Sequence, residues 1–138
     1  MITIKKKEIV KLEAVLHLYQ AVGWTNYTHQ PEMLEQALSH SLVIYLALDG
    51  DAVVGLIRLV GDGFSSVFVQ DLIVLSSYQR QGIGSSLMKQ ALKDYKDTYQ
   101  VQLVTDQTER TLGFYRSMGF EILSTYNCIG MTWTNREK

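Results

Sequence analysis

Two glycines, Gly82 and Gly84, stand at the start of a stretch with helical periodicity, directly after an apolar run typical of a strand. A glycine inside a helix costs about 1 kcal/mol relative to alanine, so a pair in the first turn indicates that something approaches the backbone closely. The N–H groups of that turn have no internal partners, and together with the helix dipole they form an anion site. The sequence therefore predicts a phosphate-binding loop here.

Two common phosphate-binding patterns do not fit this loop. The dinucleotide fingerprint G-x-G-x-x-G requires a third glycine where Leu87 stands, and a P-loop requires a Gly-Lys-Ser/Thr sequence that does not follow. The pattern that remains is Q/R-x-x-G-x-G/A, which runs from Gln79 to Gly84.

Asp71 is the best candidate for a general base. It is a carboxylate in an otherwise apolar run, shortly before the glycine loop. A carboxylate in such surroundings can accept a proton from a substrate, which is the task of a general base. A second interpretation of Asp71, equally open, is that it pairs with a nearby cation or caps the amides of a turn. Asp62, Glu109 and His29 are weaker candidates.

The composition is that of one soluble domain covering residues 1–138. Apolar residues make up 46% and charged residues 20%, and 13 basic against 14 acidic residues give a net charge of −1. This balance lacks the basic field of a nucleic-acid-binding protein. The single cysteine, Cys128, fits a reducing compartment and a small buried side chain, and no metal-ligand spacing is present. We expect a cytoplasmic protein with no membrane segment and no metal.

The periodicity predicts an α/β fold with a mixed sheet and helices on both of its faces. Asp49-Gly50-Asp51 joins two strand-like runs and indicates a hairpin. A helix between two strands, as over 82–97, leaves these strands parallel. The expected helices cover 8–24, 30–41, 82–97 and 109–118, and the expected strands lie within 42–60, 66–75, 100–105 and 128–133.

Together these features resemble the GNAT superfamily of N-acetyltransferases. The Q/R-x-x-G-x-G/A motif follows "QDLIVLSSY" (70–78), which resembles the family's fourth strand, and "GFYRSMGF" (113–120) resembles its later FY-x-x-x-GF element. The resemblance covers most of the chain and points to a small, single-domain member of bacterial type. It implies a mostly antiparallel mixed sheet of six to seven strands with about four helices.

The resemblance also implies a co-substrate, acetyl-coenzyme A, and the residues that hold it. The family binds the pyrophosphate on loop amides, with charge added at the rim by Arg80. The pantetheine arm pairs with the fourth strand, beside which the sheet splays, and the Val74 amide polarises the acetyl carbonyl. The residues that take these places are Leu72, Ile73, Val74, Arg80, Gln81, Gly82, Ile83, Gly84 and Ser85.

Tyr115 falls where the family has a tyrosine near the coenzyme sulfur, which implies a general acid that protonates the leaving thiolate. From periodicity alone, Tyr115 is a core aromatic beside Phe114 and Phe120. Thr108 stands seven residues earlier, where the family often has an asparagine that contacts the coenzyme arm. A threonine offers a hydroxyl there in place of an amide.

The acceptor side is expected in the N-terminal half. The segment "AVGWTNYTHQPEMLEQALSHS" (21–41) is similar to a subset of the family that includes plant and cyanobacterial serotonin N-acetyltransferase-like proteins. This similarity implies an amine acceptor, with Trp24 and Tyr27 on a loop over the site. The simpler interpretation of Trp24 is a core anchor at a helix end.

We therefore expect acetyl transfer to a primary amine of a small molecule by direct attack in a ternary complex, with Tyr115 as acid and Asp71 as base. One alternative is acetylation of a protein or peptide, at an N-terminus or a lysine, which predicts an open groove. Another is a regulatory module that binds coenzyme A without catalysis. A homodimer is expected from the family alone.

Overall fold

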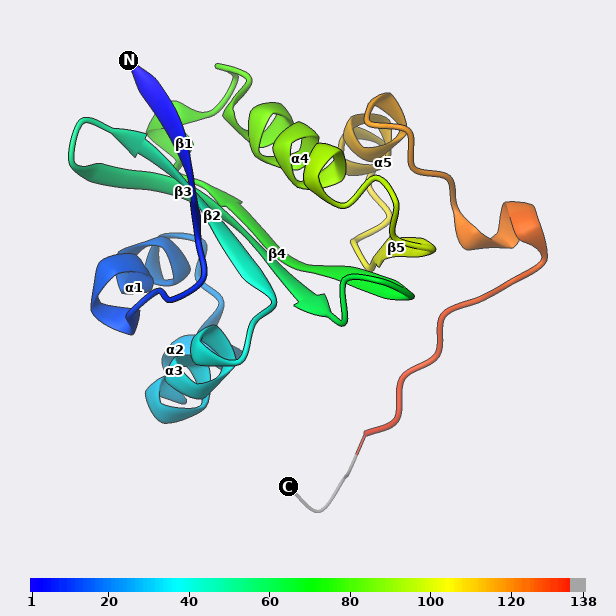
Figure 1. Ribbon diagram of the computed structural model, residues 1–138, viewed down its shortest axis with the longest axis horizontal. Coiled ribbons are helices and arrows are strands. Elements are labelled where there is room, and N and C mark those ends of the chain that lie inside the picture. Colours follow the sequence, from blue (N-terminus) through cyan, green and yellow to red (C-terminus); the bar gives the residue numbers. More distant parts are fainter. Residues whose placement is uncertain (135–138) are drawn as a thin grey trace. The chain divides into compact units, whose positions relative to one another are not determined.

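The computed structural model describes residues 1–134, in two compact units, Met1–Leu103 and the chain from Val104 onward. The first unit contains a five-stranded sheet in the order β1-β2-β3-β4-β5 (Figure 1). Its strands are β1 (Ile2–Lys7), β2 (Val43–Asp49), β3 (Ala52–Gly61), β4 (Ser66–Val74) and β5 (Gln100–Leu103). Its helices are α1 (Leu12–Ala21), α2 (Thr25–Thr28), α3 (Pro31–Ser39) and α4 (Ile83–Asp94), with a 3₁₀ turn at Ser76–Tyr78.

The predicted hairpin and crossover are both confirmed. β2 and β3 pair antiparallel around Gly50, which has a φ of +62° as such a tight turn requires. β3 and β4 are also antiparallel, whereas β4 and β5, connected through α4, run parallel. Pro31 begins α3, where its missing N–H costs no helical hydrogen bond.

The two faces of the sheet are covered by different helices (Figure 1). On one face, Leu18 and Tyr19 of α1 and Leu34 and Leu38 of α3 form a buried apolar cluster with side chains of β2, β3 and β4. α4 covers the other face, where the buried Tyr45 of β2 donates its hydroxyl to Asp94 at 2.7 Å.

A β-bulge in β4 changes the face to which its buried side chains point. Leu59 pairs with Val69, but the next residue of β3, Arg58, pairs with Asp71, so Gln70 is the extra residue. Side chains alternate between the faces of a strand, and neighbouring partners share a face. Val69 therefore lies on the face opposite to Arg58, whereas Asp71 shares the face of Arg58, toward α1.

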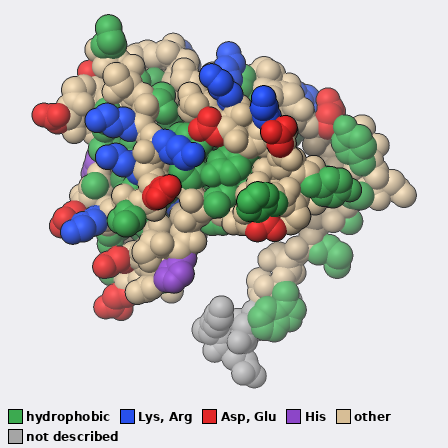
Figure 2. Space-filling model, in the orientation of Figure 1, with side chains coloured by type: hydrophobic (Ala, Val, Ile, Leu, Met, Phe, Trp, Pro, Cys, Tyr) green, Lys and Arg blue, Asp and Glu red, His purple; other side chains and the backbone are tan. Residues whose placement is uncertain are grey.

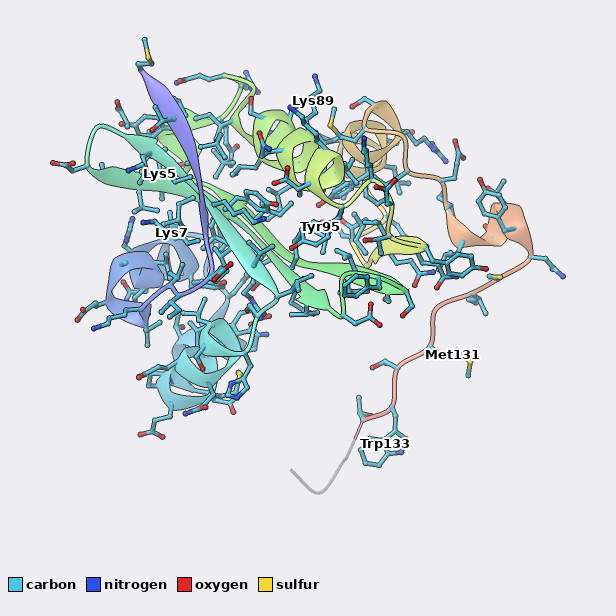
Figure 3. The ribbon with its side chains drawn as sticks, viewed as in Figure 1. Lys5, Lys7, Lys89, Tyr95, Met131 and Trp133 are labelled. Atoms are coloured by element: carbon cyan, nitrogen blue, oxygen red, sulfur yellow. The ribbon has the colours of Figure 1, made fainter. Side chains whose placement is uncertain are left out.

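The sheet differs from the sequence-based prediction in strand number, five rather than six to seven. β1 was not predicted, because its "KKK" resembles a solvated charge run. Lys5 and Lys7 lie on this edge strand (Figure 3), where exposed lysines oppose pairing with another chain. Figure 2 shows basic and acidic side chains interspersed on one face of the molecule.

The predicted final strand over 128–133 does not form in the described residues. Its alternating apolar side chains Ile129, Met131 and Trp133 are 82–94% exposed, and no strand pairs with this segment (Figure 3). Periodicity alone cannot make a strand, which requires a neighbour with free N–H and C=O groups. Cys128 is exposed rather than buried.

The second unit, described by itself, contains α5 (Glu109–Ser117) and a 3₁₀ turn at Leu123–Tyr126. α5 agrees with the helix predicted over 109–118. Among the described residues, no helix combines the length and the apolar character that crossing a membrane requires.

Candidate active site

The glycine loop leaves the first turn of α4 open. Gly82 is the N-cap, with a left-handed φ of +76°, and no side chain caps the helix there. The Ser86 N–H donates to the Gly82 carbonyl at 2.9 Å. The N–H groups of Ile83, Gly84 and Ser85 precede this bond and have no acceptor within the helix. Three donors and the positive end of the helix dipole thus face the same region.

The space beside Gly82 is open. A Cβ built on Gly82 would meet no atom within 4 Å, so the glycine is not required by packing within the protein. A glycine at this position permits the left-handed backbone conformation and leaves the first turn of the helix uncovered. The loop residues therefore fit the pyrophosphate group that the sequence motif implies.

Side-chain hydrogen bonds fix the segment that joins β4 to α4. The Tyr78 hydroxyl donates to Asp49 of the β2–β3 hairpin at 2.6 Å, and Gln79 Nε2 donates to the Val74 carbonyl at 3.1 Å. Arg80 has a φ of +66°, which a residue other than glycine seldom adopts. Two left-handed residues in three positions, Arg80 and Gly82, bend the chain sharply into α4.

The second half of β4 has an open edge. β5 pairs only with Ser66–Val69, so Leu72, Ile73 and Val74 have a strand neighbour on the β3 side alone. The Leu75 N–H donates to Val54 of β3 at 2.9 Å. The N–H and C=O groups of successive residues in a strand point to alternate sides of it. Since the Leu75 N–H points toward β3, the N–H of Val74 points away from β3. The Val74 carbonyl accepts the hydrogen bond from Gln79 Nε2, and the Val74 N–H remains available as a donor.

Asp71 forms a buried ion pair. Its Oδ2 accepts from Arg58 Nε at 2.7 Å, and the two side chains are 2% and 4% exposed. Arg58 Nη1 also donates to the Ser41 hydroxyl at 3.2 Å. A charge removed from water in this way requires a partner and further hydrogen bonds, and this pair has both. One of the two interpretations of Asp71, pairing with a cation, thus corresponds to a contact in the structure.

Two tyrosines complete the surroundings of Asp71. Tyr19 donates its hydroxyl to Oδ2 at 2.8 Å, and Tyr27 donates to Oδ1 at 3.1 Å. Burial, followed by the charge of Asp71, raises the pKa of both phenols above its ordinary value. Both hydroxyls therefore stay protonated at neutral pH.

Trp24 belongs to an aromatic cluster with the same tyrosines. Its ring centroid lies 6.2 Å from those of Tyr19 and Tyr27, and the two tyrosines meet edge to face at 5.2 Å. Trp24 and Tyr27 are only half-buried. The structure thus brings together Trp24, Tyr27 and Asp71, which the sequence analysis assigned to the acceptor side and the base.

Tyr115 and Thr108 belong to the second unit. Tyr115 of α5 packs edge to face against Phe114 and Phe120, with centroids 5.1 and 5.9 Å away. Burial, with a smaller contribution from Asp106, raises the pKa of Tyr115. Thr108 is the N-cap of α5, where its hydroxyl accepts from the Thr111 N–H at 3.2 Å. The capping role of Thr108 was not predicted.

The sequence analysis missed Arg58 and Tyr19. A signal for Arg58 was present, because it is the only charge in the apolar run "AVVGLIRLV", just as Asp71 is in "SVFVQDLIVL". Two lone charges of opposite sign in neighbouring buried strands predict an ion pair. Tyr19 carried no such signal, because an aromatic at a helical core position is ordinary.

Comparisons with known proteins agree on one family. The model of the acetyltransferase (GNAT) domain matches residues 40–122. A solved GNAT-family acetyltransferase from Streptococcus pneumoniae is 82% identical, with a TM-score of 0.91 and 99% of each chain covered. A protein of unknown function from methicillin-resistant Staphylococcus aureus is 26% identical, with a TM-score of 0.80, covering 98% of this chain and 100% of that one.

A plant protein is also similar. The chloroplastic serotonin N-acetyltransferase 2 of Oryza sativa is 30% identical over 111 residues, which is 78% of this chain. The match spans 54% of the rice protein, about half of its length.

Proposed function

Because the chain belongs to the GNAT family of acetyltransferases, whose donor is acetyl-coenzyme A, we propose that it acetylates a primary amine of a small molecule. The proposed reaction is direct attack of the amine on the acetyl carbonyl within a ternary complex. The observation that carries the proposal is the continuous segment from Leu72 to Ser85. It combines a free strand edge with an uncapped helix start, the two features that a long, phosphorylated thioester requires.

The donor would lie along this segment. Ile83, Gly84 and Ser85 donate their N–H groups to the pyrophosphate, together with the Gln81 and Gly82 amides before them, and Arg80 adds positive charge at the rim. The edge of Leu72 to Val74 pairs with the pantetheine arm as a further strand would. The Val74 N–H then donates to the acetyl oxygen, where attack on the thioester develops negative charge.

Two residues carry the proposed proton transfers. Asp71 takes the proton that the amine loses, and Tyr115 gives its proton to the departing sulfur. The raised pKa of Tyr115 keeps its phenol protonated at neutral pH, which is the state that a general acid needs. Thr108 contributes its hydroxyl to the coenzyme arm in this proposal, in addition to capping α5.

The acceptor would lie on the side of Trp24 and Tyr27. Their half-buried rings offer an apolar, aromatic surface near Asp71, which suits an amine with an aromatic or aliphatic body. The similarity to the rice protein supports an amine of this kind.

We further propose that residues 1–138 are one domain, because the family match at 40–122 runs through both compact units. We also propose a cytoplasmic location and a homodimer.

Donor binding and turnover can be tested separately. We expect acetyl-coenzyme A to raise the melting temperature and to bind in calorimetry; absence of both overturns the donor assignment. Release of free thiol is then measured with arylalkylamines, polyamines, amino acids and peptides. Turnover with small amines supports the proposal, and turnover with peptides alone replaces it by protein acetylation. Binding without any turnover replaces it by a non-catalytic coenzyme A module.

A further inference from the structure

The Tyr27 hydroxyl lies at a junction between the buried ion pair and the surface. It donates to Asp71 Oδ1 at 3.1 Å and accepts from Arg58 Nη2 at 3.2 Å. A third group, Gln70 Nε2, approaches it at 3.5 Å. Gln70 is exposed, Tyr27 is half-buried, and Arg58 and Asp71 are nearly completely buried. The hydroxyl therefore joins a carboxylate that solvent hardly reaches to a side chain in contact with solvent.

The orientation of this hydroxyl is set by its neighbours. Arg58 has only donors, so its contact occupies one lone pair of the Tyr27 oxygen, and the single phenolic hydrogen points to Asp71. The contact with Gln70 is the longest of the three and is made by an exposed side chain. It is therefore the contact that an incoming amine nitrogen can replace without breaking the buried pair.

Tyr19 supplies an internal comparison. Its hydroxyl also donates to Asp71, at 2.8 Å, but its side chain is completely buried. Both tyrosines thus support the same carboxylate, while only Tyr27 also has a partner at the surface.

We propose that Tyr27 is a proton relay between the acceptor amine and Asp71, an inference that rests on the proposed acetyltransferase function. The N–H bond of the amine breaks as a proton moves to the Tyr27 oxygen, and the Tyr27 O–H bond breaks as its proton moves to Asp71 Oδ1. One proton passes from nitrogen to carboxylate, and no electrons are exchanged with any other reagent. After product release, the proton returns to water by the same route.

The relay explains how a carboxylate enclosed by three donors acts on a substrate that it does not touch. The raised pKa of Tyr27 supports passage of the proton in a chain rather than prior formation of a tyrosinate. Arg58 remains charged throughout and acts as a positioning residue that holds both Asp71 and the Tyr27 oxygen.

The test compares three tyrosine-to-phenylalanine variants. Tyr27→Phe keeps the ring and removes the relay, and Tyr19→Phe removes a buried donor to the same carboxylate. Tyr45→Phe, the control, removes a hydroxyl that donates to Asp94 on the opposite face. We expect kcat to fall about 100-fold in Tyr27→Phe, a typical size for loss of general acid–base catalysis. KM for the amine and affinity for acetyl-coenzyme A change less than threefold, and Tyr45→Phe retains full turnover.

Two further measurements separate a relay from a structural role. Melting temperatures show whether each variant is folded. Tyr19→Phe and Tyr27→Phe are expected to lose similar stability, but kcat is expected to fall less in Tyr19→Phe. With amines of decreasing pKa, the defect of Tyr27→Phe is expected to shrink, because such amines are already neutral. If wild-type protein turns over an amine and Tyr27→Phe matches Tyr45→Phe, the relay alone is overturned. If wild-type protein turns over none, the proposed function falls and the relay with it.

Discussion

Arg58 and Asp71 are register partners in β3 and β4, and their side chains meet on one face of the sheet, with Nε 2.7 Å from Oδ2. They meet because the bulge at Gln70 turns Asp71 toward α1, where Tyr19 and Tyr27 donate to it. A single inserted residue thus assembles an ion pair, two phenols and the aromatic cluster around Trp24. The stability of this face and the proposed chemistry depend on the same group of side chains.

The first prediction concerns this ion pair. Removing one member of a buried pair leaves an uncompensated charge and typically costs about 3–5 kcal/mol. We therefore expect Arg58→Met to lower the free energy of unfolding by that amount, measured by urea denaturation. The double variant Arg58→Met/Asp71→Leu should recover much of the loss, because both charges are gone. A double variant as unstable as the sum of its single variants would contradict this account.

The second prediction concerns Gly82. A left-handed backbone costs an alanine about 1–2 kcal/mol, so Gly82→Ala should either lose stability or shift the loop. We expect its affinity for acetyl-coenzyme A to fall at least tenfold in calorimetry. Gly23→Ala is the matched control, since Gly23 has a φ of +72° and likewise no atom within 4 Å of a built Cβ. Equal weakening of donor binding by both changes would argue against the phosphate loop.

The third prediction concerns Gln79, whose amide holds the Val74 carbonyl. A neutral hydrogen bond contributes about 1 kcal/mol, so Gln79→Ala should reduce kcat/KM about fivefold by loosening the peptides that present the Val74 N–H. The control is Gln90→Ala, which removes a similar bond of 3.1 Å within α4 to Asp94. Unchanged turnover in Gln79→Ala would show that Val74 is held by its strand pairing alone.

The fourth prediction concerns alkaline pH. Burial, and then the hydrogen bond to Asp94, raise the pKa of Tyr45 above the value of about 10 that it has in the unfolded chain. Since the folded pKa is the higher one, this contribution to stability is complete below pH of about 10 and is lost as pH rises further. Urea midpoints between pH 8 and 11 should decline less steeply in Tyr45→Phe, although this variant is less stable at pH 8. Parallel declines would contradict the prediction.

Features fixed by local chemistry could be predicted from the sequence. Asp49-Gly50 specifies its hairpin through a positive φ, Pro31 marks the start of α3, and Gly82 marks the bend into α4. Each of these signals acts within a few residues, so no knowledge of distant neighbours is needed. The open edge of β4 was expected from the family resemblance. That this edge begins after Val69, the last residue of β4 that pairs with β5, came only from the structure.

Features that depend on distant partners were harder to predict. β1 is a strand because β2 offers it an edge, even though its lysines suggest a solvated segment. The segment from Cys128 to Trp133 has the alternation of a strand but no neighbour in the described residues. The lone charges of Arg58 and Asp71 indicate an ion pair, but the register and the bulge that bring their side chains to one face came only from the structure.

The bulge at Gln70 also divides β4 into two segments under different physical constraints. Before it, Val67 and Val69 are constrained by volume alone, and one aliphatic side chain can replace another there. After it, Asp71 is constrained by charge and by three partners at once. Substitutions can therefore accumulate in the first segment while the second stays fixed, and the packing of this strand can evolve without its chemistry being lost.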